Sequence, residues 1–140
     1  MGWLGLGSKT PAKKRLLIAE DDDGIRSMFK AFLEVYEFDI LEAEDGRQAV
    51  DIARKELPAV ILMDAEMPRM DGWSASAILS RDPRTSHIPI LMCTVHKRIA
   101  DVERSLSMGV KDFIPKPVDL DQLLEKVRRV IQGFDLRSGK

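Results

Sequence analysis

The chain has 140 residues, of which 44% are hydrophobic and 32% charged, and its formal net charge is -1. This size suits one domain with a single core, and the composition is typical of a folded globular protein rather than a disordered or fibrous one. The near-neutral charge argues against a broad nucleic-acid-binding surface. The single cysteine, Cys93, excludes an internal disulfide, and no cysteine or histidine cluster indicates a zinc site; we expect Cys93 to be a small buried residue.

Neither end of the chain predicts an export or membrane segment. No apolar stretch approaches the length that a bilayer span needs. Gly2 follows the initiator Met, but Leu6 stands where an acylation signal has Ser or Thr. We therefore interpret residues 1–14 as a flexible lead-in, 15–132 as the folded domain and 133–140 as a C-terminal tail, and expect a cytoplasmic location.

From Arg15 onward, short apolar runs alternate with segments of helical period, which is typical of a parallel sheet covered by helices. The run 59–63 is continuously apolar, so it is predicted to lie in the middle of the sheet. The predicted strands are 16–19, 38–43, 59–63, 88–93 and 112–115.

Helices are predicted between these strands. The first is expected to begin after a cap at Asp22 or Asp23 and to place five apolar residues on one face. These are Ile25, Met28, Phe29, Phe32 and Leu33. The other predicted helices are 44–57, 72–80, 99–109 and 119–131.

Polar side chains stand at the carboxyl ends of four predicted strands. The acidic run 20–23 follows the first strand, Asp64 the third, Thr94 the fourth and Lys116 the fifth. Binding sites of open parallel sheets form outside the carboxyl ends of the strands. We therefore expect these side chains to meet at one edge of the sheet.

The gathered carboxylates favour a bound cation. Carboxylates repel one another unless a cation or proton intervenes, and hard oxygen ligands suit Mg2+, so Asp21 and Asp64 are predicted ligands. Asp64 is then able to attack phosphorus as a nucleophile and form an aspartyl phosphate. Lys116 and the Thr94 hydroxyl are expected to meet oxygens of the transferred group, because phosphoryl transfer depends mostly on positioning and charge neutralisation.

Each of these features also has a structural interpretation. Acidic residues after a strand commonly cap the next helix, and Asp64 alone is compatible with the start of a turn. Thr94 is of a type that is ordinary at strand ends, and Lys116 by itself is an ordinary loop lysine. The placement of all four features at strand ends favours a functional site.

Four motifs resemble, in order, those of the receiver domains of bacterial two-component response regulators, the CheY-like family. They are LIAEDD, LMDAEMPRMDG, LMCT and DFIPKP. The resemblance covers residues 15–132. It implies an α/β fold, a flavodoxin-like (βα)5 doubly wound sandwich with a five-stranded parallel sheet in the order 2-1-3-4-5.

The resemblance also implies a role for each site residue. Asp64 matches the phosphoacceptor, and Glu20 and Asp21 match the acidic pair that holds Mg2+. Lys116 matches the phosphate-contacting lysine, and Thr94 matches the switch hydroxyl.

Three further features are implied by position in the family motifs. The main-chain carbonyl of Glu66 is expected to complete the metal site, and Phe113 to act as the switch aromatic. The bond before the proline is often cis in the family, which makes Lys116–Pro117 a candidate, although X-Pro bonds in general favour trans.

The chain departs from the family pattern near the site. Glu20 replaces the commoner Asp, so we expect its carboxylate to reach Mg2+ through water and Asp21 to be the firmer ligand. Phe113 lacks the hydroxyl of the frequent Tyr, and Val95 replaces a smaller Ala and is expected to narrow access to the phosphoryl group. Glu66 is expected either to repel a phosphodonor or to orient a hydrolytic water.

The implied function is that of a phosphoacceptor in a two-component phosphorelay. A sensor histidine kinase or phosphotransfer protein would donate the phosphoryl group to Asp64 in a Mg2+-dependent reaction that the receiver catalyses itself. The added charge would draw in Thr94, admit Phe113 and change a surface that binds a downstream protein. We expect a signalling protein rather than an enzyme, a monomer or weak dimer, acting as a single-domain response regulator without direct DNA or membrane binding.

Other functions are also compatible with the sequence. A phosphorylation-independent interaction module would retain the fold, although the complete Asp, Thr and Lys set argues against it. A Mg2+-dependent aspartyl phosphatase of the haloacid-dehalogenase type also uses a strand-end Asp, but typically has a second Asp where this chain has Glu66. A receiver cut from a larger regulator or hybrid kinase is a third alternative.

Overall fold

The computed structural model describes residues 12–95, 103 and 108–136 of the chain. The strands in this part of the chain are β1 (Arg15–Ala19), β2 (Asp39–Ala43), β3 (Val60–Asp64), β4 (Ile90–Thr94) and β5 (Val110–Pro115). They pair in parallel in the order β2-β1-β3-β4-β5, which confirms the predicted sheet. The predicted strand boundaries differ from these by one or two residues.

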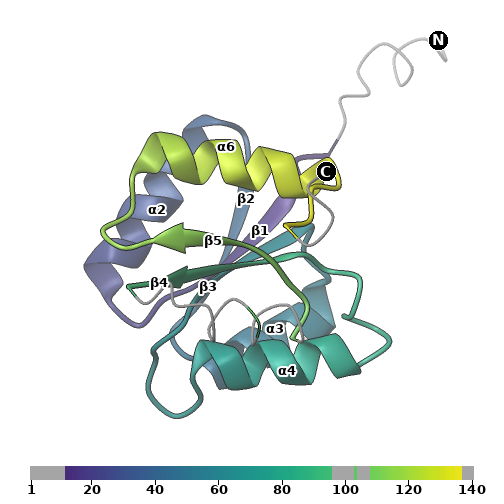
Figure 1. Ribbon diagram of the computed structural model, residues 1–140. Coiled ribbons are helices and arrows are strands. Elements are labelled where there is room, and N and C mark those ends of the chain that lie inside the picture. The colour runs from purple at the N-terminus through teal and green to yellow at the C-terminus, as the bar shows by residue number, and fades with distance from the viewer. Residues whose placement is uncertain (1–11, 96–102, 104–107, 137–140) are drawn as a thin grey trace, which may run out of the picture.

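Helices cover both faces of the sheet. Those with described bounds are α2 (Asp23–Val35), α3 (Gly46–Glu56), α4 (Gly72–Arg81) and α6 (Leu120–Ile131). Helices α2 and α6 pack on one face and α3 and α4 on the other, which is the expected doubly wound arrangement (Figure 1). Most of the helix predicted at 99–109 lies outside the described residues. None of the helices in the described ranges is both long and apolar enough to cross a bilayer.

The apolar core forms two layers, one on each face of the sheet. Every residue of β3 and β4 is buried, which agrees with the continuous apolar run predicted for the third strand. Phe29 and Leu33 of α2 and Val127 of α6 pack in one layer. Val50 of α3 and Leu79 of α4 pack in the other. Strand β3 is therefore held on both faces and by β1 and β4 at its sides, which makes it a rigid support for the residue at its carboxyl end.

Each of these four helices begins directly after an aspartate that caps it. The carboxylate accepts a hydrogen bond from a backbone N–H of the first turn, which satisfies one of the donors left free at a helix start. The capping residues are Asp22, Asp45, Asp71 and Asp119. Of the two candidates for the first helix, Asp22 is therefore the cap.

The apolar face of α2 is buried over only part of its length. Phe29 and Leu33 are buried, but Ile25 is 38% exposed and Met28 is 47% exposed. Ile25 and Met28 line a groove with Pro117, which follows β5, instead of packing inside the core layer. The apolar face of α2 thus extends past the sheet at its amino-terminal end.

The chain continues past α6 onto the amino-terminal end of β5. The Leu136 N–H donates a hydrogen bond to the Lys111 carbonyl at 2.9 Å, and Lys111 Nζ lies 3.1 Å from Asp135 Oδ2. Phe134 packs partly against the core. Residues 133–136, predicted as part of a tail, are therefore attached to the folded domain.

Candidate functional site

The carboxyl ends of β1 and β3 bring three carboxylates together. Asp64 ends β3 and Glu20 follows β1, and each is only 4% exposed. Asp21 is exposed. One carboxylate oxygen from each residue lies within 4.8 Å of the other two. The acidic cluster expected from the sequence is formed, and Asp21 is its member most open to solvent.

Lys116 reaches this cluster from the end of β5, two strands away from β3. Its Nζ donates a hydrogen bond to Asp64 Oδ1 at 2.7 Å. Its backbone N–H donates to the Thr94 carbonyl at 3.1 Å, which ties the end of β5 to the end of β4. The Lys116–Pro117 bond is cis, as the family resemblance made possible, and not the trans form that X-Pro bonds in general favour.

Burial and charge shift the protonation of this cluster. Burial raises the pKa of Glu20 to about 7, and the charge of Asp64 adds to this, although the Asp22 N–H and Lys116 oppose it. Burial acts to lower the pKa of Lys116, but the hydrogen bond and charge of Asp64 outweigh it and hold that pKa above its ordinary value. The site therefore stabilises the charged form of Lys116 and disfavours the charged form of Glu20.

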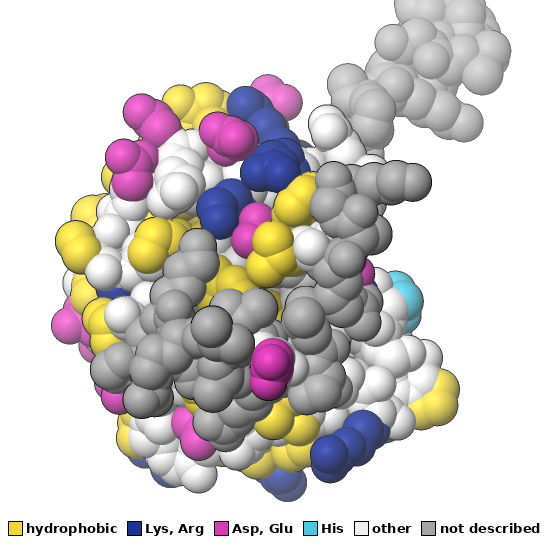
Figure 2. All heavy atoms as spheres, viewed as in Figure 1, with side chains coloured by type: hydrophobic (Ala, Val, Ile, Leu, Met, Phe, Trp, Pro, Cys, Tyr) yellow, Lys and Arg dark blue, Asp and Glu magenta, His cyan; other side chains and the backbone are white. Residues whose placement is uncertain are grey.

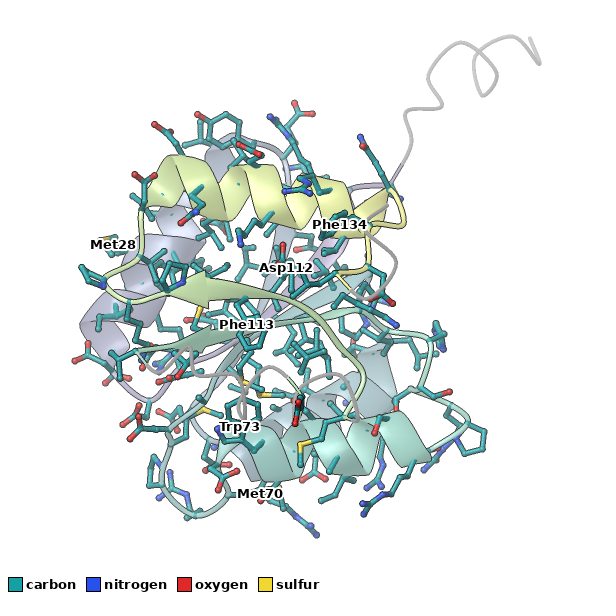
Figure 3. All side chains as sticks on the ribbon, viewed as in Figure 1. Met28, Met70, Trp73, Asp112, Phe113 and Phe134 are labelled. Carbon is teal, nitrogen blue, oxygen red and sulfur yellow. The ribbon has the colours of Figure 1, made fainter. Side chains whose placement is uncertain are left out.

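Thr94 and Phe113 lie on one face of the sheet beside this cluster. Asp64 pairs with Cys93, so Thr94 is one residue further along β4, and it is 4% exposed. Phe113 pairs with Met92, which shares a face with Thr94 because side chains alternate along a strand. Phe113 is 1% exposed and points to the α4 side of β5 (Figure 3). The switch aromatic predicted from the sequence thus occupies an inward position.

A tight loop of residues 65–71, here the β3–α4 loop, carries Glu66 past the site. The Glu66 N–H donates to Asp64 Oδ1 at 3.3 Å, and its side chain is exposed. The Gly72 N–H donates to the Ala65 carbonyl at 2.9 Å and closes the loop at its base. A Cβ on Gly72 would lie 2.1 Å from the Asp64 carbonyl oxygen, so this close return requires glycine. The Glu66 carbonyl as a metal ligand stays a prediction.

Three charged residues that the sequence did not single out support this edge. Arg26 of α2 is 9% exposed, and its Nη1 donates to the Glu20 carbonyl at 2.7 Å. Asp45 accepts a hydrogen bond from Arg69 of the β3–α4 loop at 2.5 Å. The sequence gives one indication that Arg26 has a structural role, which is its position next to the apolar face of a predicted helix. Nothing in the sequence pairs Asp45 with Arg69.

The donor set fits Mg2+. The three clustered side chains offer hard carboxylate oxygens, which Mg2+ prefers, and their repulsion is relieved by a cation. The exposed position of Asp21 leaves the ion an entry path and room for the waters that Mg2+ usually retains. Glu20, Asp21 and Asp64 are the residues that would hold it.

Comparison with known proteins identifies the family. A family model of the response regulator receiver domain matches residues 16–128, which is most of the chain. The chain belongs to the response regulator receiver family. Receiver domains are signalling modules of two-component systems, and this receiver carries an acidic cluster at the strand edge where the phosphoacceptor is expected.

The relatives of this receiver differ in the share of their own length that it covers. It is 35% identical over 119 residues to Protein PilH of Pseudomonas aeruginosa, with 85% of this chain and 98% of PilH covered. It is 33% identical over 121 residues to the DNA-binding dual master transcriptional regulator RpaA of Synechocystis sp., with 86% of this chain covered. The receiver spans only 50% of RpaA and about half of the similar probable transcriptional regulators ycf27, for example that of Porphyra purpurea.

Solved receiver structures share the fold. The chemotaxis protein CheY4 of Vibrio cholerae has a TM-score of 0.81 at 28% identity, covering 85% of this chain and 99% of CheY4. The receiver domain of the sensor histidine kinase PA1611 from Pseudomonas aeruginosa has a TM-score of 0.79 at 28% identity, covering 87% of this chain and all of that one. That structure has a magnesium ion coordinated in its active site cleft.

Proposed function

We propose that this receiver accepts a phosphoryl group on Asp64 from a sensor histidine kinase or phosphotransfer protein in a Mg2+-dependent reaction. The observation that carries the proposal is the position of the Asp64 carboxylate. It is buried at the end of the central strand, within 4.8 Å of carboxylate oxygens of Glu20 and Asp21 and 2.7 Å from Lys116 Nζ. A carboxylate surrounded in this way is held in a fixed position for nucleophilic attack, and the nearby ammonium compensates its negative charge.

The proposed transfer exchanges one bond to phosphorus for another. A carboxylate oxygen of Asp64 forms a bond to phosphorus while the bond to the donor histidine nitrogen breaks, and the imidazole leaves with the electron pair. Lys116 is placed to move its hydrogen bond from Asp64 to a phosphoryl oxygen. When bound, Mg2+ supplies positive charge that offsets the carboxylates and the phosphoryl oxygens. Attack by water on phosphorus later returns Asp64 and phosphate, which is autodephosphorylation rather than turnover of an external substrate.

The groove beside Lys116 is proposed as the docking place of the phosphodonor. Exposed Ile25 and Met28 line it with Pro117, next to Glu20. Figure 2 shows apolar side chains gathered at the left of the molecule, where Figure 3 places Met28. An apolar surface adjoining the phosphoacceptor is suited to hold a partner helix while its histidine reaches Asp64.

The switch is proposed to use Thr94 and Phe113. Phosphoryl oxygens on Asp64 would accept a hydrogen bond from the Thr94 hydroxyl, and the movement of Thr94 changes the space on the face where Phe113 is buried. We propose a downstream protein in the cytoplasm as the target of the changed surface. A protein target fits the net charge of -1 better than a DNA target does.

Phosphorylation with a small donor tests the proposal. The protein is incubated with acetyl phosphate and Mg2+, and its intact mass is measured. We expect one acid-labile phosphoryl group, none in Asp64→Asn and none when EDTA removes Mg2+. Asp51→Asn is the matched control, because Asp51 lies on α3 with a side chain that is 63% exposed. It should be phosphorylated like the wild type.

The alternatives give different results in the same assay. If Asp64→Asn became phosphorylated to the same extent, the assignment of the phosphoacceptor would be wrong. Steady hydrolysis of a small phosphate ester would favour the phosphatase. No Mg2+ binding, together with partner capture that Asp64→Asn leaves unchanged, would favour the phosphorylation-independent module.

A further inference from the structure

The β3–α4 loop is attached to the turn between β2 and α3 by two contacts. Arg69 Nε donates a hydrogen bond to Asp45 Oδ2 at 2.5 Å. The Gly46 N–H donates to the Met70 carbonyl at 2.8 Å. We name this pair of contacts the loop clamp. It joins a turn that follows an outer strand of the sheet to the loop that leaves the central strand.

The residues of the loop clamp are constrained beyond what a surface turn requires. Asp45 is only 2% exposed, and its other oxygen accepts the Gln48 N–H at 2.8 Å as the cap of α3. A Cβ on Gly46 would lie 2.4 Å from the Met70 carbonyl oxygen, so the two backbones approach too closely for any other residue. Arg69 has a φ of 66°, which is unfavourable for a residue with a side chain and persists where the surroundings hold it.

The loop clamp acts on the same backbone that adjoins Asp64. At the base of the loop, the Gly72 N–H donates to the Ala65 carbonyl, and the Glu66 N–H donates to Asp64 Oδ1. The base and the far side of the loop are thus both fixed. Releasing the far side at Arg69 frees the backbone around Glu66, while the buried strand that carries Asp64 stays in place.

We infer that Asp45 and Arg69 are positioning residues for the metal site, a role that rests on the proposed function. They do not touch the clustered carboxylates. They hold the β3–α4 loop in the shape that keeps the Glu66 backbone beside Asp64. Loss of either residue should weaken Mg2+ binding although no ligand side chain is altered.

Two variants separate the loop clamp from other roles of its residues. Asp45→Asn keeps a good helix cap but loses the charge that pairs with Arg69. Arg69→Gly removes the side chain and suits a positive φ, so it releases the loop without adding strain. Mg2+ affinity of the full chain, measured by calorimetric titration, should fall roughly tenfold in each, as when groups that orient metal ligands are lost. The double variant should bind Mg2+ no more weakly than the weaker-binding single variant. The two substitutions remove the same interaction, so their effects should not add.

Arg54→Met is the matched control for losing an arginine–aspartate pair. Arg54 Nε lies 3.0 Å from Asp82 Oδ2, joining α3 to the end of α4 away from the carboxylates. This variant should bind Mg2+ like the wild type. All variants should show cooperative urea unfolding, and amide hydrogen exchange at Gly46 should quicken in Arg69→Gly without any metal present.

The outcomes distinguish this inference from the proposed function. If the wild type binds Mg2+ and both Asp45→Asn and Arg69→Gly bind it equally well, the positioning role is wrong and the proposed function is unaffected. Weaker binding in Arg54→Met as well would also overturn it, since any lost ion pair would then have the same effect. A wild type that binds no Mg2+ would overturn the proposed function and the inference together.

Discussion

Lys116 Nζ donates a hydrogen bond to Asp64 Oδ1 at 2.7 Å, although β4 lies between the strands that carry the two residues. Asp64 has a side chain that is only 5% exposed, so its charge needs a partner inside the protein. The ammonium supplies part of that compensation before any phosphoryl group arrives. Lys116 is therefore expected to matter for the stability of the metal-free protein as well as for phosphoryl transfer.

Lys116→Met tests this compensation. Without the ammonium, buried carboxylate charge is left unpaired, and the free energy of unfolding in EDTA should fall by about 2 kcal/mol. Mg2+ should raise the free energy of unfolding more in the variant than in the wild type. In the variant the bound cation also neutralises the carboxylate charge that Lys116 no longer compensates. Urea unfolding with EDTA and with Mg2+ measures both effects. Equal stabilisation of the two proteins by Mg2+ would contradict the prediction.

Gly72→Ala should be destabilising. Its Cβ would lie 2.1 Å from the Asp64 carbonyl oxygen, and relieving that overlap must move the loop or the end of β3. We expect a loss of about 1–3 kcal/mol in the free energy of unfolding. Gly24→Ala on α2 is the matched control, since the nearest atom to its Cβ would be Asp22 Oδ1 at 3.3 Å. It should be neutral or slightly stabilising, and equal losses in the two variants would count against the explanation.

Asp45 should contribute to stability in a pH-dependent way. Hydrogen bonding from the Gln48 N–H, followed by that from Arg69, holds the pKa of Asp45 below its ordinary value. A lowered folded-state pKa gives stability that is complete above the unfolded value of about 3.9 and is lost as the pH falls through the folded pKa. The free energy of unfolding, measured in urea, should be higher for the wild type than for Asp45→Asn at pH 7. This difference should become smaller below about pH 4. A gap that stays constant down to pH 2 would refute this.

Cys93 should be unreactive in the folded protein. It is 2% exposed, burial raises the pKa of its thiol, and the charge of Asp64 adds to the shift, so thiolate is scarce at pH 8. A chromogenic disulfide reagent should give no reaction in buffer and one equivalent in urea, since the chain has one cysteine. Rapid labelling of the folded protein would show that the end of β4 opens more readily than its burial indicates.

The sheet and the acidic cluster were predictable because local patterns determine them. The continuous apolar run of β3 predicts a central strand, and parallel topology then brings Asp64, Asp21, Thr94 and Lys116 to one edge. The sequence also places Phe29 and Leu33 in the core. These features depend on periodicity and strand direction, both of which can be read along the chain.

Contacts across loops were not predictable in this way. Ile25 and Met28 have the helical spacing of core residues, but helical periodicity does not reveal where the sheet beneath the helix ends. Asp45 and Arg69 lie 24 residues apart, and each alone is compatible with an exposed turn residue. Only the folded backbone shows that the two turns meet.

The described chain begins and ends at the edge of the sheet opposite Asp64. Lys14, before β1, and Gln132, after α6, line the same groove at that edge. Strands of five residues separate this edge from the carboxylates by roughly 15 Å. A surface anchor joined to the described chain before residue 12 or after residue 136 would therefore start at the edge opposite the clustered carboxylates, and we expect it to leave the carboxylate edge facing the solution. An immobilised protein should remain accessible to the proposed phosphodonor in flow, which would allow binding of that donor to be measured on a surface.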